Sequence, residues 1–172
     1  PQGIIAVCEM RSKRLDDFLA SGKMLLVLDR VTDPGNIGTM LRTADAAGVG
    51  GLLLLQGCAD IYAPKTVRAS MGSLFHLPVL SGLSEELLVQ AARKAGYELL
   101  VTCLDGADNL YKADLQGRIA FVMGNEANGV SPALLAAADK RVFIPMQGRA
   151  ESLNVAMAAG IVMFEALRQK LK

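Results

Sequence analysis

The stretch "IPMQGRAESLNVAMAAG", residues 144–160, joins the end of an apolar run to a polar loop and then to a pattern of small and apolar residues. This order predicts a buried strand that leads through a loop into a helix. Ser152 and Asn154 stand where that helix begins, and either side chain could cap it by accepting hydrogen bonds from first-turn amides. The rest of the chain repeats this strand, loop and helix order, which is typical of an α/β domain.

Composition limits the classes of protein to which the chain could belong. With 172 residues, 52% of them hydrophobic, it is predicted to form one globular domain over residues 1–172. Cys8, Cys58 and Cys103 are far apart and form no C-x-x-C pair, so neither a disulfide framework nor a zinc site is expected. This predicts a reducing, cytoplasmic setting. The apolar runs are too short to cross a bilayer, and no membrane partner is expected.

Most of the predicted strands are apolar throughout, which is typical of strands covered on both faces of a parallel sheet. They comprise residues 4–7, 25–28, 51–55, 99–102, 119–123 and 142–144. Helical patterns separate them. One covers residues 36–47 and stops at Gly48, and another begins with Ser84 as its cap and ends at Gly96. We therefore expect a mostly parallel sheet with helices on both faces.

Loops rich in Gly, Asn, Asp or Glu follow four of the apolar runs, at residues 33–38, 105–109, 124–131 and 147–154. Ligands of open α/β sheets bind beyond the carboxyl ends of the strands, so these loops are predicted to form one pocket.

Common nucleotide and hydrolase motifs do not fit these loops. "GNEANG", residues 124–129, lacks the P-loop lysine because Val130 stands in its place. No G-x-G-x-x-G or G-x-S-x-G sequence occurs. The single histidine, His76, is interpreted as a structural residue within a strand. With near-neutral net charge, +1, composition gives no strong electrostatic case for nucleic-acid binding.

The stretch "DPGNIGTMLRTADAAG", residues 33–48, carries several polar candidates. Asn36 is predicted to cap the helix, and Gly38 to leave its first turn open to a ligand. Arg42 lies nearly opposite the apolar stripe of this helix. Two interpretations of Arg42 stay open: a surface pair with Asp45, or a guanidinium presented to a phosphate or a developing oxyanion.

Three segments together resemble the ordered motifs of the SpoU (TrmH-like) family of RNA ribose 2'-O-methyltransferases, within the SPOUT superfamily. They are "NIGTMLRTADAAG", "FVMGNEANGVS" and "IPMQGRAESLNVAMAAG", and the resemblance extends over nearly the whole chain. It implies an α/β domain with a C-terminal trefoil knot, S-adenosylmethionine bound in the knotted loops, and a homodimer formed through the knot region. Many relatives also carry an N-terminal RNA-binding domain, which this chain is expected to lack.

The resemblance also assigns site residues by motif. The implied cofactor-binding residues are Gly124, Ile144, Leu153, Asn125, Met146 and Thr102. The positions implied for catalysis, or for shaping the site, are Arg42, Asn36, Glu126, Ser152 and Asn154. No metal ion is expected. Ser152 and Asn154 could still be simple helix caps, an alternative that the pattern alone does not remove.

The chemistry implied is direct transfer of a sulfonium methyl group to a ribose 2'-hydroxyl of RNA, with ribosomal RNA favoured over transfer RNA. Arg42 is the first choice for the catalytic residue, as a phosphate anchor or oxyanion stabiliser, because a guanidinium rarely loses its proton. Glu126 could be a base or could orient Asn36 or Arg42. The competing hypotheses are a transfer RNA 2'-O-methyltransferase, a transferase acting on a base nitrogen and a noncatalytic RNA-binding protein of the same fold.

The last helix, from residue 155 onward, is apolar on all sides of its first turns and should therefore be buried. The burial could be within the core or between subunits. The resemblance favours a subunit interface.

Overall fold

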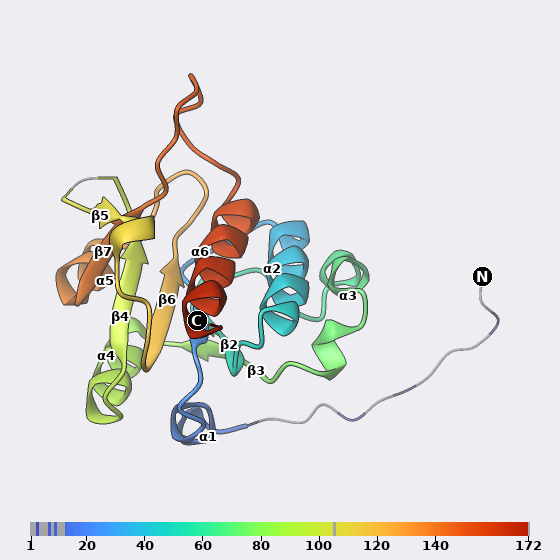
Figure 1. The fold of residues 1–172 in the computed structure, drawn as a ribbon. Helices are drawn as coiled ribbons and strands as arrows, with labels where there is room; N and C mark the ends of the chain where they lie inside the picture. The colour runs from blue at the N-terminus through green and yellow to red at the C-terminus, as the bar shows by residue number, and fades with distance from the viewer. Residues whose placement is uncertain (1–2, 4–6, 8, 10–12, 105, 172) are drawn as a thin grey trace.

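The computed structural model describes residues 3, 7, 9, 13–104 and 106–171. The strand predicted over residues 4–7 lies outside these residues except for Val7, which is fully exposed. Within the described part of the chain, seven parallel strands form one sheet in the order β3-β2-β1-β6-β4-β7-β5 (Figure 1). They are β1 (Leu25–Leu28), β2 (Gly51–Leu55), β3 (Val79–Leu83), β4 (Glu98–Thr102), β5 (Asp108–Asn109), β6 (Ile119–Met123) and β7 (Lys140–Phe143).

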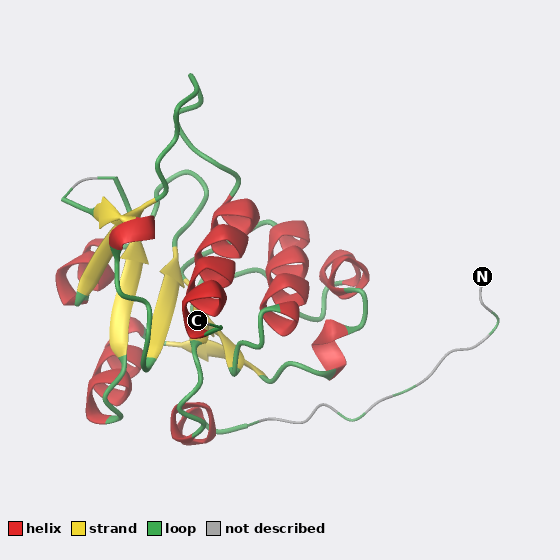
Figure 2. Cartoon of the chain, viewed as in Figure 1, coloured by secondary structure: helices red, strands yellow, loops and turns green. Residues whose placement is uncertain are grey.

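Helices cover both faces of this sheet, as predicted (Figure 2). They are α1 (Leu15–Ala20), α2 (Pro34–Ala46), α3 (Pro64–Ser70), α4 (Glu85–Lys94), α5 (Pro132–Ala137) and α6 (Val155–Lys170), with short 3₁₀ turns η1 (Ser73–Phe75) and η2 (Leu110–Lys112). Side chains alternate between the two faces of a strand. In β1, Leu26 and Leu28 join the core beneath α2 and α6, whereas Leu25 and Val27 join the core beneath α1, α4 and α5.

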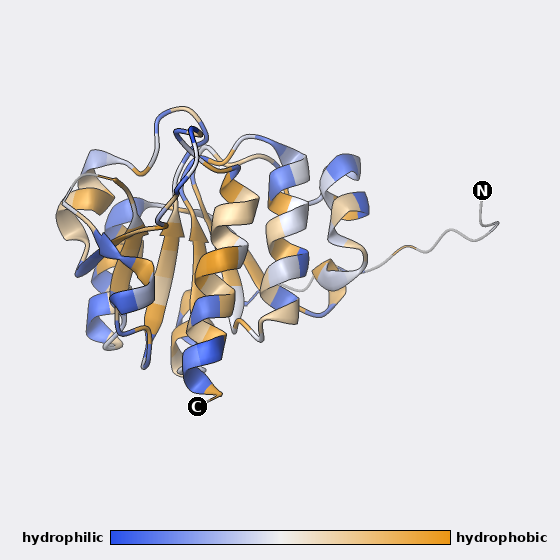
Figure 3. Cartoon of the chain, turned by 45° about the horizontal axis from the view of Figure 1, so that its top comes forward, coloured by the Kyte–Doolittle hydropathy of each residue, from blue (hydrophilic) through white to orange (hydrophobic). Residues whose placement is uncertain are grey.

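Figure 3 shows the apolar strands enclosed between the helices, and α6 changing from apolar to hydrophilic toward its C-terminal end. Two large apolar side chains of α6 remain exposed, Met157 by 61% and Phe164 by 46%. Among the described residues, no helix combines the length and the hydropathy that crossing a bilayer requires.

The start of α2 differs from the prediction. Asp33, not Asn36, is the N-cap, and its carboxylate accepts a hydrogen bond from the Asn36 backbone N–H over 3.1 Å. Proline at the first helical position favours this earlier start because it needs no hydrogen-bond acceptor there. Asn36 therefore lies inside the first turn, and its side chain is available for other contacts.

The prediction that Gly38 leaves its backbone open to a ligand is wrong. Gly38 is buried against α3, and a Cβ atom added to it would lie 2.5 Å from the Ala69 Cβ and 2.6 Å from the Thr66 carbonyl oxygen. The glycine therefore allows α2 and α3 to pack closely, and it does not face a ligand.

His76 is not in a strand. It follows η1 with 72% of its side chain exposed, and its Nδ1 lies 3.4 Å from an Asp45 carboxylate oxygen. Asp45, which one interpretation paired with Arg42, thus faces His76 instead.

Replacing Gly38 with alanine tests the contact between α2 and α3. The new methyl group must push the two helices apart, so Gly38→Ala should lower the free energy of unfolding by about 1–3 kcal/mol. Gly160→Ala is the matched control, because that helical glycine would bring its Cβ only to 3.4 Å from the Thr43 side chain. Denaturant unfolding of both variants checks this. Equal stability of the Gly38→Ala variant and the unmodified chain would contradict the packing role.

Candidate functional site

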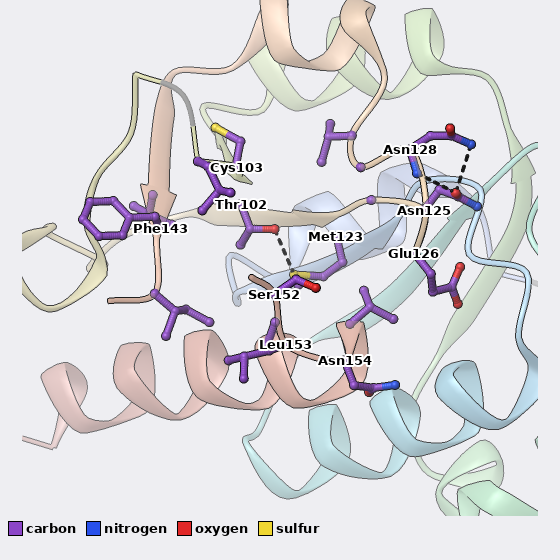
Figure 4. Close-up of a pocket in the computed structure, with 18 of the residues that line it drawn as sticks. Thr102, Cys103, Met123, Asn125, Glu126, Asn128, Phe143, Ser152, Leu153 and Asn154 are labelled. Carbon is purple, nitrogen blue, oxygen red and sulfur yellow. Dashed lines mark hydrogen bonds between the residues drawn. The ribbon is translucent and has the colours of Figure 1, made fainter. Parts of the chain in front are cut away.

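A pocket of about 660 Å³ lies beyond the carboxyl ends of β4, β6 and β7 (Figure 4). Its walls come from three segments that are distant in sequence: the end of β4, the loop after β6, and the loop between β7 and α6. Parallel strands bring their carboxyl ends to one edge of a sheet, and this is why the three segments meet there.

The loop after β6 is folded tightly on itself. Asn125 and Gly129 exchange two backbone hydrogen bonds of 3.0 and 2.9 Å. A Cβ atom at Gly124 would lie 2.2 Å from the backbone of both Gly129 and Val130, so only glycine fits at this position. The Asn125 side-chain oxygen also accepts the backbone N–H groups of Ala127 and Asn128, each at 3.0 Å. These hydrogen bonds fix the shape of the loop that forms this wall of the pocket.

The opposite wall is the loop that enters α6. Asn154 is the N-cap of this helix and accepts hydrogen bonds from the backbone N–H groups of Ala156 and Met157, at 2.9 and 3.3 Å. Of the two candidate caps, it is Asn154 that caps α6. Ser152 lines the pocket and stands beside Leu153 in Figure 4.

Asn36 connects the two loops from its place in α2. Its amide nitrogen donates to Glu126 Oε1 over 3.0 Å, and its amide oxygen accepts a hydrogen bond from Asn154 Nδ2, also over 3.0 Å. One side chain from each of the three motif segments thus takes part in a single chain of hydrogen bonds. Each amide uses both its donor and its acceptor, which fixes the orientation of the side chains.

Glu126 is held in its ionised form. Desolvation, the largest single influence, raises the pKa of Glu126, but hydrogen bonds to the carboxylate together outweigh it, and the pKa lies below its usual value. The donors are the Asn36 side chain, the backbone N–H of Glu126 itself, and the backbone N–H groups of Thr32 and Asp33, the last two at 3.4 Å. A carboxylate with a lowered pKa is a weak base near neutral pH.

The structure brings most of the predicted site residues into this one pocket. Those that line it are Gly124, Ile144, Leu153, Asn125, Met146, Thr102, Glu126, Ser152 and Asn154. Asn36 lies behind Glu126 and Asn154 and contacts both of them. Arg42 is not brought in: it is exposed on α2 and does not line the pocket.

Several lining residues were not found from the sequence. Cys103 and Leu104 directly follow β4, and Met123 ends β6, where the Thr102 hydroxyl donates to its sulfur over 3.8 Å. Their position at strand ends was the available signal. Arg141 and Glu151 add charge to the lining, and the Arg141 guanidinium donates to the Leu135 carbonyl oxygen over 2.9 Å. No local pattern distinguishes Arg141 from an ordinary surface charge, whereas Glu151 lies in the loop 147–154 that was predicted to form part of the pocket.

The side chains that the structure describes give no indication of a metal centre. Within residues 13–104 and 106–171, no three His, Cys, Asp or Glu side chains are grouped so that they could hold a metal ion. The polar lining consists instead of amides, hydroxyls, backbone groups and separate charges.

Known relatives match this chain over most of its length. A 23S rRNA guanosine 2'-O-methyltransferase from Bacillus subtilis (strain 168) is 40% identical over 164 residues, which are 95% of this chain and 64% of that protein. A 23S rRNA uridine 2'-O-methyltransferase from Streptomyces viridochromogenes is 41% identical over 177 residues, which cover 99% of this chain and 62% of that protein. The chain thus spans less than two thirds of the length of these relatives.

A solved structure has the same fold. An rRNA methyltransferase from Sinorhizobium meliloti, crystallised with S-adenosylmethionine, superposes with a TM-score of 0.87 at 38% identity, over 95% of this chain and 63% of that one. The model of the SpoU rRNA methylase family matches residues 23–164, which include all three motif segments. The chain belongs to the SpoU rRNA methylase family.

Proposed function

We propose that this chain binds S-adenosylmethionine in the pocket and transfers its methyl group to a ribose 2'-hydroxyl of RNA, with ribosomal RNA as the favoured substrate. The observation that carries the proposal is that residues from three distant segments meet in one pocket. The six residues assigned to the cofactor by motif all line one pocket, beside Glu126, Ser152 and Asn154. Relatives that cover most of the chain are named as methyltransferases of 23S rRNA, and this supports the choice of RNA.

The residues present fit this cofactor. A volume of about 660 Å³ lies within the usual range for a small-molecule site. Apolar side chains such as Leu153, Ile144 and Met146 offer a surface for a purine ring, and the tight loop at Gly124 offers backbone groups for hydrogen bonds. The carboxylates of Glu126 and Glu151 outnumber the one guanidinium in the lining, that of Arg141, and this favours a cation in the pocket.

When bound, S-adenosylmethionine supplies a methyl group already activated by its sulfonium charge. The chain must then align the ribose oxygen with that methyl group, let the hydroxyl proton pass to a base or to solvent, and keep water from taking the place of the ribose oxygen. Alignment alone can lower a barrier by about 7–11 kcal/mol in favourable systems. The loop after β6 and the capped start of α6 are suited to this task because their own hydrogen bonds hold their shape.

Glu126 is assigned an orienting role. Its lowered pKa and its hydrogen bonds to Asn36, Thr32 and Asp33 make it a poor general base. Through Asn36 it fixes the amide of Asn154, so the three side chains hold the pocket mouth in one arrangement.

Arg42 requires a different explanation, because it lies outside the pocket of its own chain. We assign it to the pocket of a second copy in a homodimer. Met157 and Phe164 leave apolar surface exposed on α6, the helix that packs beside α2, and Leu153 at the pocket mouth is 39% exposed. A second copy docked along this surface would cover these side chains, and across that interface we assign the Arg42 guanidinium to a phosphate or a forming oxyanion.

Methyl transfer to ribosomal RNA tests the proposed reaction. The chain, incubated with labelled S-adenosylmethionine and ribosomal RNA, should give labelled 2'-O-methylated nucleosides after digestion. Label in a methylated base would favour transfer to a nitrogen. Cofactor binding without any transfer, also with transfer RNA as substrate, would favour a noncatalytic RNA-binding protein.

A mixed dimer tests the assignment of Arg42. Arg42→Ala should abolish turnover and leave cofactor affinity unchanged, because its guanidinium is assigned to an RNA phosphate or the forming oxyanion and not to the cofactor. Gly124→Ala should distort the loop 124–131, and with it the pocket of its own chain, because the added Cβ would lie 2.2 Å from the Gly129 backbone. Co-expression of the two inactive variants should restore one working site per mixed dimer. No recovery of methyl transfer in purified mixed dimers would place Arg42 in its own chain's site or outside the mechanism.

The ionisation of Glu126 predicts a pH dependence of stability. Because its pKa is lower in the folded chain than the value of about 4.3 in the unfolded chain, its stabilising contribution is present above that pH and is lost as pH falls through the folded pKa. Glu126→Gln should therefore reduce the loss of thermal stability between about pH 5 and pH 3. The Tm of this variant and of the unmodified chain should be measured as a function of pH. An identical fall in Tm in the two proteins below about pH 5 would contradict the assignment.

A further inference from the structure

Two residues that follow β1, Asp29 and Arg30, lie outside every motif considered so far. Asp29 is fully buried, with 0% of its surface exposed. An ionisable side chain is rarely buried without partners, because removing its charge from water is costly. The partners of Asp29 therefore indicate what it does.

The Asp29 carboxylate has two sets of partners. It accepts the Arg30 guanidinium in a bidentate pair, from Nε at 2.8 Å and from Nη2 at 3.0 Å. Asp29 Oδ2 also accepts the backbone N–H of Ser131 over 2.7 Å, across 102 residues of sequence. Ser131 is the last residue of the loop 124–131, which forms one wall of the pocket, and it caps α5.

Arg30 holds the other end of the same loop. Its backbone carbonyl oxygen accepts a hydrogen bond from Asn125 Nδ2 over 2.7 Å. Arg30 adopts a left-handed conformation, with φ of 53°, which is uncommon for a residue other than glycine. Its side chain passes over Gly57, where an added Cβ atom would lie 3.1 Å from the Arg30 Cγ. The ion pair with Asp29 and this packing hold Arg30 in place.

The loop 124–131 needs these external contacts. Its internal bonds between Asn125 and Gly129 fix its shape, but they do not fix its position relative to the sheet. Asp29 ties down its last residue, and Arg30 ties down its second. Both contacts come from the end of β1, the strand that pairs directly with β6.

We propose that Asp29 and Arg30 are positioning residues that hold the loop 124–131 at the distance from the loop 144–154 that S-adenosylmethionine requires. This inference rests on the proposed function, because the ligand is the cofactor assigned there. The two residues touch neither the cofactor nor the ribose, and they act through Asn125 and Ser131. Loss of either contact removes an anchor that the hydrogen bonds of Glu126 to Asn36, Thr32 and Asp33 do not replace, so cofactor affinity falls more than stability accounts for.

The test is the Kd of S-adenosylmethionine, measured by calorimetry alongside Tm, in matched variants. Asp29→Asn puts an NH₂ group against N–H donors, either those of Arg30 or that of Ser131, and should raise Kd at least tenfold. Arg30→Gly accepts the left-handed backbone but removes the guanidinium, and should raise Kd likewise. Arg30→Lys keeps the charge without the bidentate geometry and should recover part of the affinity.

Glu165→Gln is the matched control. Glu165 is a carboxylate with 7% of its side chain exposed, and it forms a bidentate pair with Arg168 near the end of α6, away from the pocket. Its replacement should lower Tm without changing Kd. If Glu165→Gln and Asp29→Asn lost the same affinity for the same fall in Tm, the role of Asp29 would be reduced to general stability.

The outcomes separate this inference from the proposed function. An unmodified chain that fails to bind S-adenosylmethionine contradicts the proposed function. If the unmodified chain binds and folded Asp29→Asn and Arg30→Gly bind within twofold of it, the positioning role is overturned. Where Asp29→Asn does not fold, Arg30→Gly and Arg30→Lys decide, because affinities of both variants within twofold of the unmodified chain would show that the guanidinium is not needed.

Discussion

The hydrogen bonds of the Asn36 amide join parts of the chain that lie 90 and 118 residues apart. The amide donates to Glu126 and accepts from Asn154, so its two polar atoms connect the loop after β6 to the start of α6. The pocket between these loops depends on that connection. A helix cap or a tight loop fixes only its own segment, whereas the Asn36 side chain fixes the separation between two segments.

Much of the architecture follows from the chemistry of short stretches. Strands such as β1 and β6 are apolar on both faces because helices cover both sides of the sheet, and this pattern is readable without coordinates. The strands β3 and β5 were not predicted because they are not covered on both sides in this way. They lie at the two edges of the sheet, where Ser81 and Asp108 are exposed, and no continuous apolar run marks them.

The candidate site was predictable as a set of residues but not as a geometry. Motif order identified the residues that line the pocket, yet the roles read from local pattern were partly wrong. Local pattern predicts Asn36 as the helix cap, but Asp33 caps the helix. It predicts Gly38 as a ligand contact, but Gly38 packs against α3. Both errors arise because a partner distant in sequence decides the function of the residue. The trefoil knot implied by the family resemblance concerns the path of the whole chain and stays a prediction.

Hydrogen–deuterium exchange with and without S-adenosylhomocysteine, the product left after methyl transfer, would test most directly whether the three segments form one cofactor site. Residues 102–104, 124–131 and 144–154 should gain protection together, at ligand concentrations that follow one binding curve. The exposed loop around Tyr62, beyond β2, should show no change. Protection confined to one of the three segments, or found only at the β2 loop, would contradict the account.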